Sequence, residues 1–235
     1  MISEKKLAVV FTSLWREITP LAERFVRHQN LQMSRFTLPM SSDVTAGMRG
    51  ISGELGFRLF CSAKSNNLEP MDLSTDTISE LADETVAYIR RFRQFNRVEV
   101  QLPDRNAIAD AELLAQRLCI FFDSSRGPLL LRPQFAGVGA LDACEGDVLA
   151  GDTLFEIKSA DRTLRVIDIR QLLVYCAINF ATRKYEIRNV GIVNPRSGLF
   201  FVQPLTEMVR EVSGGSVPDI LSTIVEFACR QTPSN

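Results

Sequence analysis

Apolar residues at helical spacing predict three helices in the first half of the chain, over residues 13–32, 77–96 and 106–123. Asp76 or Thr77 is the expected N-cap of the second helix and Asn106 that of the third, because short polar side chains accept hydrogen bonds from a first helical turn. Between the first two helices, GFRLFCSA at residues 56–63 predicts a strand. VEVQLP at residues 98–103 alternates in polarity and predicts another.

The second half of the chain consists of short apolar runs, typical of strands, around one long apolar helix. The expected strands span residues 129–135, 140–149, 153–160, 189–195 and 199–205. The helix, residues 165–182, separates the third strand from the fourth, and a helical region ends the chain. We therefore expect the α/β class, with a mixed sheet flanked by helices, and an N-terminal α+β region of unknown role over residues 1–103.

Besides Asp152 in the expected turn, Asp147, Glu156 and Lys158 interrupt the apolar pattern of GDVLAGDTLFEIKS, residues 146–159. A two-residue hairpin turn at 151–152 would place Asp147 opposite Glu156. The strand period of two then puts Lys158 on the same face as Glu156. Because facing carboxylates repel, this arrangement favours a bound cation or one protonated acid.

Carboxylate oxygens suit Mg²⁺ or Mn²⁺, and His28, the only histidine, is far from the hairpin in sequence, which argues against a typical zinc hydrolase. A lysine beside such a site can hold a water or stabilise a phosphorane-like transition state, which predicts phosphodiester chemistry. The same register places Glu145 opposite Lys158. Two alternatives stay open: a register shifted by one residue, which separates the two acids, and a simple ion pair on a solvated sheet face.

The helix over residues 165–182 carries Gln171 and Tyr175 one turn apart, on one face. Packed beside the hairpin, they would hold Lys158 or bind a substrate phosphate. The alternative is a surface glutamine and a half-buried core tyrosine.

With these residues together, the sequence resembles the PD-(D/E)xK nuclease superfamily, and within it the RecB-like branch with a QxxxY motif. The resemblance rests on G-D at 146–147, E-I-K at 156–158 and Q-x-x-x-Y at 171–175, and it covers about residues 106–205. It implies a restriction-endonuclease-like core within a nuclease-like domain over residues 104–235.

The resemblance also implies a role for each matched residue. Asp147 and Glu156 would bind the metal, Lys158 would assist the attacking water, and Gln171 and Tyr175 would support them. Many members carry a further acidic ligand on the helix before the first strand. In this chain Glu112 is the candidate for that ligand, with a solvated helix carboxylate as the alternative.

Asp142 is a rival of Asp147 for the first acid of the motif. An iron–sulfur cluster, which some RecB-like enzymes hold with four cysteines, is not expected, because Cys229 stands alone at the C-terminal end.

The formal net charge of −1, from 27 Lys and Arg against 28 Asp and Glu, excludes a protein that binds nucleic acid through bulk charge. Any such binding requires a local patch. Candidates near the site are Arg162, Arg165, Arg170, Arg183, Lys184 and Arg188. Residues 88–97 interleave arginines with aromatics, as either a nucleic-acid stripe or a solvated basic face, and Arg196 is a candidate phosphate contact.

The resulting hypothesis is a Mg²⁺- or Mn²⁺-dependent nuclease that hydrolyses DNA phosphodiester bonds in prokaryotic defence, restriction or repair. By family analogy it would work beside a helicase, an ATPase or another subunit, with homo-oligomerisation left open. The alternatives are a non-cleaving nuclease-fold module that binds nucleic acid or a protein, and an interaction protein with an exposed ion-pair set. Five scattered cysteines without a CxxC pair, and no apolar run of about 18 residues, predict a cytoplasmic protein without a membrane span.

Overall fold

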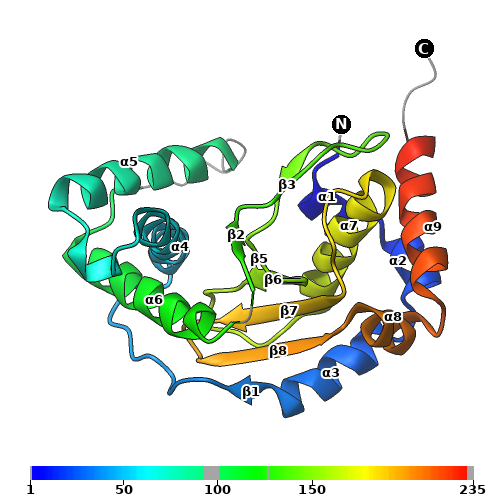
Figure 1. Cartoon of the computed structure of the whole chain (residues 1–235), viewed down its shortest axis with the longest axis horizontal. Helices are drawn as coiled ribbons and strands as arrows, with labels where there is room; N and C mark the ends of the chain where they lie inside the picture. Colours follow the sequence, from blue (N-terminus) through cyan, green and yellow to red (C-terminus); the bar gives the residue numbers. More distant parts are fainter. Residues whose placement is uncertain (1, 93–100, 126, 232–235) are drawn as a thin grey trace.

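A six-stranded mixed sheet is the centre of the computed structural model, which describes residues 2–92, 101–125 and 127–231 (Figure 1). The strands, in their order across the sheet, are β1 (Ser34–Arg35), β8 (Leu199–Pro204), β7 (Asn189–Asn194), β6 (Thr153–Ile157), β5 (Val148–Ala150) and β2 (Leu129–Leu131). β6 and β7 run parallel, and the other neighbours run antiparallel. The predicted α/β class with a mixed sheet is therefore confirmed.

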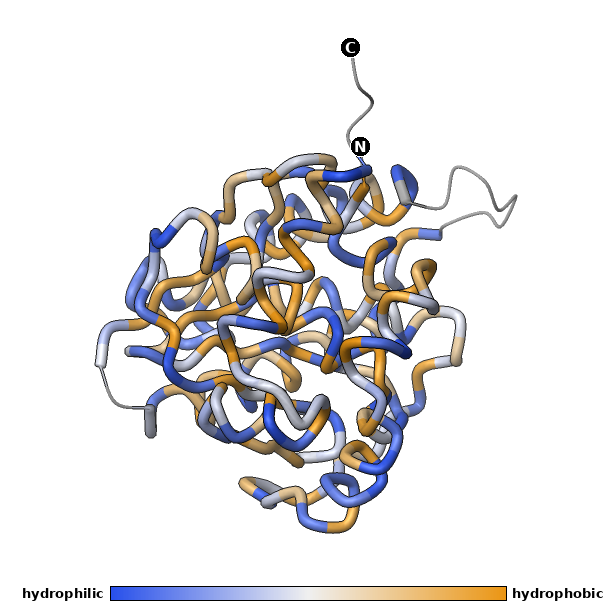
Figure 2. Tube along the Cα trace, turned by 90° about the vertical axis from the view of Figure 1, so that its right-hand side faces the viewer, coloured by the Kyte–Doolittle hydropathy of each residue, from blue (hydrophilic) through white to orange (hydrophobic). Residues whose placement is uncertain are grey.

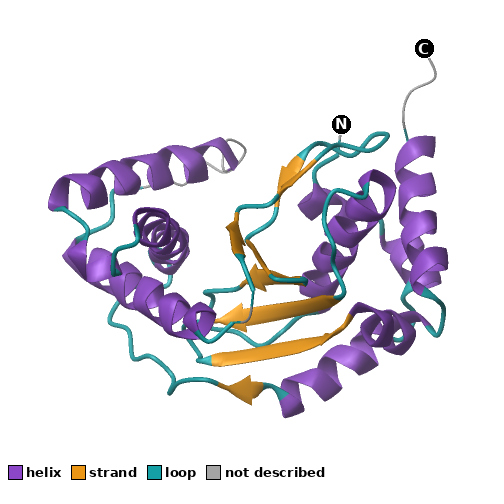
Figure 3. Cartoon of the chain, viewed as in Figure 1, coloured by secondary structure: helices purple, strands orange, loops and turns teal. Residues whose placement is uncertain are grey.

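Helices cover both faces of this sheet (Figure 3). One layer consists of α4 (Arg49–Asn66), the short 3-10 helix η1 (Pro70–Asp72), α5 (Thr75–Phe92) and α6 (Arg105–Asp123). The opposite layer consists of α1 (Glu4–Val10), α2 (Thr12–Ile18), α3 (Ala22–Gln32), α7 (Val166–Thr182), α8 (Leu205–Ser213) and α9 (Val217–Arg230). A separate hairpin, β3 (Gln134–Phe135) with β4 (Cys144–Glu145), extends from the sheet edge.

Strand β6 has a hydrophobic core on each side. Leu154 packs in the cluster of α7 and its neighbours, whereas Phe155 packs in the cluster of α4 and α6. The parallel pairing of β6 with β7 requires a crossover connection, which the almost fully buried α7 provides. Packing on both faces and pairing with β5 and β7 therefore fix the position of β6 and of the residues at its end.

Several predicted elements form with shifted or broken boundaries. Helix 13–32 is divided into α2 and α3 around Pro20. Strand 129–135 is divided into β2 and β3 at Arg132, whose φ is +51°. Strand 140–149 becomes β4 and β5, while helix 165–182 and the two strands after it are confirmed.

The strand predicted over residues 56–63 is wrong, because these residues lie inside α4. Phe57, Leu59 and Phe60 are all buried, since α5 and α6 both pack against α4. Because α4 is buried on nearly all sides, its sequence lacks a clear amphipathic period, and its short apolar runs resemble a buried strand. Gly56 allows α6 to come close: a Cβ there would lie 2.9 Å from the carbonyl oxygen of Ala111.

The predicted N-caps are also wrong. Asp104, not Asn106, caps α6, and its carboxylate accepts a hydrogen bond from the Ala107 N–H at 2.8 Å. Helix α5 begins at Thr75, so Asp76 and Thr77 are both in its first turn. Of the strand predicted over 98–103, residues 98–100 lie outside the described residues and residues 101–103 form no strand.

Within the described ranges, every helix is too short or too polar to span a lipid bilayer. Figure 2 agrees, because hydrophobic and hydrophilic positions alternate along the chain at short intervals.

A buried ion pair connects α6 to the turn between β7 and β8. The Arg196 guanidinium donates to both carboxylate oxygens of Asp110, at 3.0 and 2.6 Å, and both side chains are almost fully buried. Ser42 and Ser52 each donate to the same carboxylate at 2.6 Å. Arg196 also donates to the carbonyl of Ser159, and so supports the segment after β6. The suggested phosphate contact by Arg196 is therefore not available.

Replacing Asp110 with alanine should lower the free energy of unfolding by about 3–5 kcal/mol, because it leaves a buried guanidinium without its partner. Burial acts to raise the pKa of Asp110, but hydrogen bonds from Arg196, Ser42 and Ser52 outweigh it and lower the pKa. The stabilisation is therefore complete above the unfolded pKa of about 4 and is lost as the pH falls through the lower folded value. Urea denaturation between pH 7 and pH 2 measures both effects.

Asp123→Ala is the matched control on the same helix. Asp123 pairs with Lys64 but is 56% exposed, so its loss should cost at most about 1 kcal/mol. Equal, small losses in the two variants would contradict the assigned role of Asp110.

Candidate active site

The β5–β6 hairpin has the register predicted from its turn. Val148 pairs with Phe155 and Ala150 with Thr153, around the turn at residues 151–152. Just beyond the last pair, the Asp147 carboxylate accepts a hydrogen bond from the Ile157 N–H at 2.6 Å. Asp147 therefore lies against the end of β6, beside the strand residue Glu156.

Glu145 does not lie opposite Lys158, and that prediction is wrong. The chain turns away after Asp147, and Glu145 pairs instead with Gln134 in the β3–β4 hairpin. The positive φ of Arg132 on the neighbouring strand marks the same bend. Long-range pairing of β3 with β4 decides this path, and the β5–β6 turn alone does not reveal it.

A continuous series of hydrogen bonds fixes the lysine of the hairpin. The Lys158 ammonium donates to Glu156 Oε1 at 2.6 Å and to Gln171 Oε1 at 3.0 Å. Gln171 Nε2 donates to the Tyr175 hydroxyl at 3.0 Å, and that hydroxyl donates to the Glu145 carbonyl at 3.3 Å. The helix face expected to hold the lysine does contact it, and both helix residues are buried rather than on the surface.

Asp147, Glu156 and Lys158 lie close enough for their charges to shift the pKa values of Asp147 and Lys158. Burial and the nearby Glu156 raise the pKa of Asp147 above its usual range. Burial acts to lower the pKa of Lys158, but Glu156 and Asp147 outweigh it, so the pKa of Lys158 is raised and the side chain stays an ammonium. Burial raises the pKa of Tyr175, which keeps its phenol as a donor. Lys158 is shared with Asp168 at 3.9 Å, and Lys5 also acts on Asp147 and Glu156, but the pKa of Asp147 is still raised. A divalent cation would relieve the remaining repulsion between the two carboxylates.

One oxygen of the site carries the argument for a metal. The Glu156 side chain is only 4% exposed, and its Oε2 is buried without a hydrogen-bond partner among the described residues. A buried carboxylate oxygen without a partner is costly, and coordination of a cation removes that cost. Because Mg²⁺ is often held by only one or two carboxylates, with water and substrate oxygens completing its shell, Asp147 and Glu156 suffice.

A third protein carboxylate does not join this pair. Among the described residues, no three His, Cys, Asp or Glu side chains are grouped closely enough to hold one ion. Glu112 lies on α6 and lines neither cavity that borders Asp147. The structure therefore does not bring Glu112 to the other predicted ligands.

A cavity of about 550 Å³, here called the site cavity, opens over the carboxylates. Its walls come from α1, α4, α5 and the loop before β5, and Asp147, Glu156, Gln171 and Tyr175 form part of its surface. Asp142 also lines it, but from the loop, whereas Asp147 is the acid bonded to β6.

Charged residues of the site cavity that the sequence did not reveal include Glu54, Arg58 and Lys5. Glu54 and Arg58 form an ion pair on α4 at 3.0 Å, and Lys5 reaches the cavity from α1. Interpreting part of α4 as a strand hid the helical spacing of the first two. No local pattern connects Lys5 with a hairpin more than a hundred residues away.

Four of the six basic residues expected around the site, Arg162, Arg170, Lys184 and Arg188, have other partners. Arg162 binds Asp168 through two hydrogen bonds at 2.7 and 2.8 Å, and Arg170 stacks over the Trp15 ring. Arg188 pairs with Glu186, and Lys184 donates to a backbone carbonyl of β3. The cations that line the site cavity are instead Lys5, Arg58 and Arg132.

Of the aromatic and basic stripe predicted over residues 88–97, Tyr88 lines the site cavity. Residues 93–97 lie outside the described residues.

The chain matches no protein-family model and no curated protein sequence. The geometry of the site is accordingly the basis for assigning a function.

Asp147→Asn should abolish stabilisation by Mn²⁺ without unfolding the protein. Asparagine keeps an acceptor for the Ile157 N–H and removes the repulsion with Glu156. At about 100 times its Kd, Mn²⁺ should raise the Tm of the wild-type protein by roughly 5–10 °C, and that of the variant hardly at all. Differential scanning fluorimetry measures both.

Asp142→Asn and Glu112→Gln serve as controls and should keep the full shift. If Asp142→Asn loses the shift while Asp147→Asn keeps it, Asp142 is the first ligand and the assignment to Asp147 fails.

Proposed function

We propose that the chain is a metal-dependent nuclease that hydrolyses DNA phosphodiester bonds, with a restriction-endonuclease-like core. The observation that carries this proposal is the unpartnered Glu156 Oε2, next to Asp147 and an ammonium fixed by Gln171. Two metal-binding carboxylates with an adjacent lysine suit attack on a phosphodiester, where negative charge develops on phosphate oxygens.

The order of elements supports the proposed core. Helix α6 precedes the antiparallel strands β2, β5 and β6, then α7 crosses to β7, which is parallel to β6. A role beside a helicase, an ATPase or another subunit, in prokaryotic defence, restriction or repair, belongs to the same proposal and rests on the motif resemblance alone.

Each side chain has a distinct task in the proposed reaction. Asp147 and Glu156 would hold Mg²⁺, which when bound activates a water and offsets charge on the phosphate. The Lys158 ammonium keeps Glu156 Oε1 in place, and Oε2, which has no hydrogen-bond partner among the described residues, would bind the ion. The same ammonium lies where it can stabilise the negative charge of the transition state, and Gln171 and Tyr175 prevent it from moving away.

The direct test is a cleavage assay with purified protein and Mg²⁺ or Mn²⁺, over linear, circular, single-stranded and duplex DNA and over RNA. Lys158→Ala and Glu156→Ala should each lower kcat by at least about 100-fold, since each removes charge from the reacting centre. Asp142→Asn is the folded control. Cleavage that persists in both alanine variants would exclude this site, and DNA binding without cleavage would favour a nuclease-fold binding module.

Tyr175→Phe tests the support of the lysine. Loss of the hydroxyl removes its bonds to Gln171 and Glu145, which should lower kcat about 5- to 30-fold with little change in KM. Tyr185→Phe is the control, because its hydroxyl donates to the Gln134 carbonyl at the exposed β3. A KM effect with unchanged kcat would place Tyr175 in substrate binding instead.

A further inference from the structure

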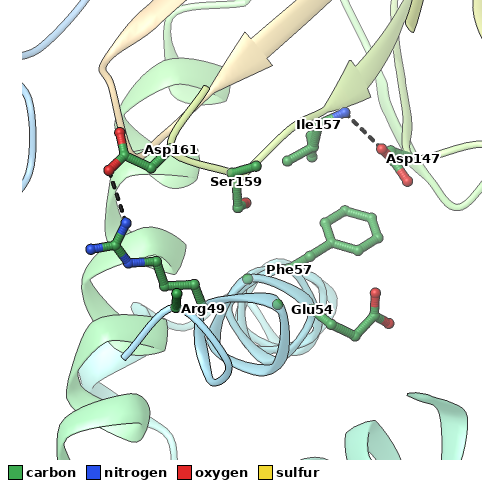
Figure 4. Close-up of a pocket in the computed structure, with 11 residues that line it drawn as sticks. Arg49, Glu54, Phe57, Asp147, Ile157, Ser159 and Asp161 are labelled. Atoms are coloured by element: carbon green, nitrogen blue, oxygen red, sulfur yellow. Dashed lines mark hydrogen bonds and ion pairs between the residues drawn. The ribbon is translucent and has the colours of Figure 1, made fainter. Parts of the chain in front are cut away.

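A second cavity adjoins the candidate active site on the α4 side, with a volume of about 430 Å³, and is here called the α4 cavity. Figure 4 shows Arg49, Glu54 and Phe57 of α4 on one wall, and Asp147, Ile157, Ser159 and Asp161 on the other. Its volume lies within the range of about 300–1,000 Å³ that is typical of small-molecule pockets.

The α4 cavity and the site cavity meet at Asp147. Both are lined by Glu54, Phe57 and Asp147. A phosphodiester bound at Asp147 and Glu156 therefore has a cavity on each side of its phosphate. The nucleotide on one side would occupy the α4 cavity.

The surface of the α4 cavity suits a nucleobase. Between the side chains of Arg49, Glu54 and Phe57, the α4 wall has an open stretch at Gly50, where a built Cβ would have no atom within 4 Å. The Phe57 ring adds an apolar contact, while the Ser159 hydroxyl supplies a polar one. The carboxylates of Glu54 and Asp161 lie on the same surface, so the cavity combines apolar contacts with several polar groups.

Arg49 provides the matching contact for a phosphate. It pairs with Asp161 at 2.9 Å, but the two side chains are 33% and 69% exposed, so this ion pair is weak and exchangeable. Its Nε donates to the Val44 carbonyl at 3.2 Å and keeps the guanidinium at the cavity. Arginine is well suited to phosphate because its planar group donates two parallel hydrogen bonds.

From these observations, and resting on the proposed function, we infer that the α4 cavity binds the nucleotide next to the scissile phosphate, with its base unpaired and Arg49 on a flanking phosphate. A base in a duplex would first have to leave its stack and its partner, which costs free energy. The preferred substrate is therefore a single-stranded segment or a frayed end.

Gly50→Leu tests the inference by filling the cavity. Leucine is a better helix former than glycine, so the variant should fold, and it leaves Asp147, Glu156 and the Mn²⁺-induced Tm shift unchanged. Binding of a fluorescent single-stranded oligonucleotide, measured by anisotropy in Ca²⁺, should weaken at least 10-fold. Cleavage in Mn²⁺ should lose kcat/KM to a similar extent. Arg49→Met should also weaken binding.

Gly47→Leu is the matched control, because Gly47 is a nearby glycine with nothing within 4 Å of a built Cβ and does not line the cavity. It should bind and cut like the wild type. Equal binding by the Gly50 and Gly47 variants would overturn the inference and leave the nuclease proposal standing. If the wild type binds blunt duplex and single-stranded DNA with equal affinity, the inference that the bound base is unpaired is wrong. Binding sensitive to Gly50→Leu without any cleavage would support the pocket and refute the nuclease.

Discussion

The site depends on the repulsion between two neighbouring carboxylates, those of Asp147 and Glu156. The ammonium of Lys158 binds Glu156 on one side and Gln171 of α7 on the other. Asp147 and Glu156 lie together because the turn at residues 151–152 sets the register of their strands. Lys158 neutralises one oxygen of Glu156, and the other oxygen is buried with no hydrogen-bond partner in the part of the chain that the structure describes. In the proposed nuclease, a bound cation would offset this imbalance.

The rest of the fold keeps this imbalance in place. Hydrophobic cores on both faces of β6 prevent its end from relaxing toward solvent, and α7 brings Gln171 and Tyr175 against the lysine. Beyond Lys158, the buried Arg196 binds the Ser159 carbonyl and is itself held by Asp110. The buried contacts of Arg196 with Asp110 and Ser159 therefore help to position the site residues at the end of β6.

The sequence permitted prediction of the parts of the site that depend on local spacing. The hairpin register follows from one turn, and the shared face of Gln171 and Tyr175 follows from the helical period. Features that depend on long-range contacts could not be predicted from local sequence spacing. α4 is buried on nearly all sides, so its sequence lacks an amphipathic period and resembles a strand, which concealed Glu54. Pairing of β3 with β4 moved Glu145 away from Lys158, and tertiary packing alone brings α1 to the cavity.

Anomalous diffraction from crystals soaked in Mn²⁺ is the most direct test of the central claim, since it locates the ion independently of any activity. A peak is expected within bonding distance of Glu156 Oε2 and the Asp147 carboxylate, with Lys158 still bonded to Glu156 Oε1. A protein that cleaves DNA with Mn²⁺ but shows its peak away from both carboxylates would contradict that claim.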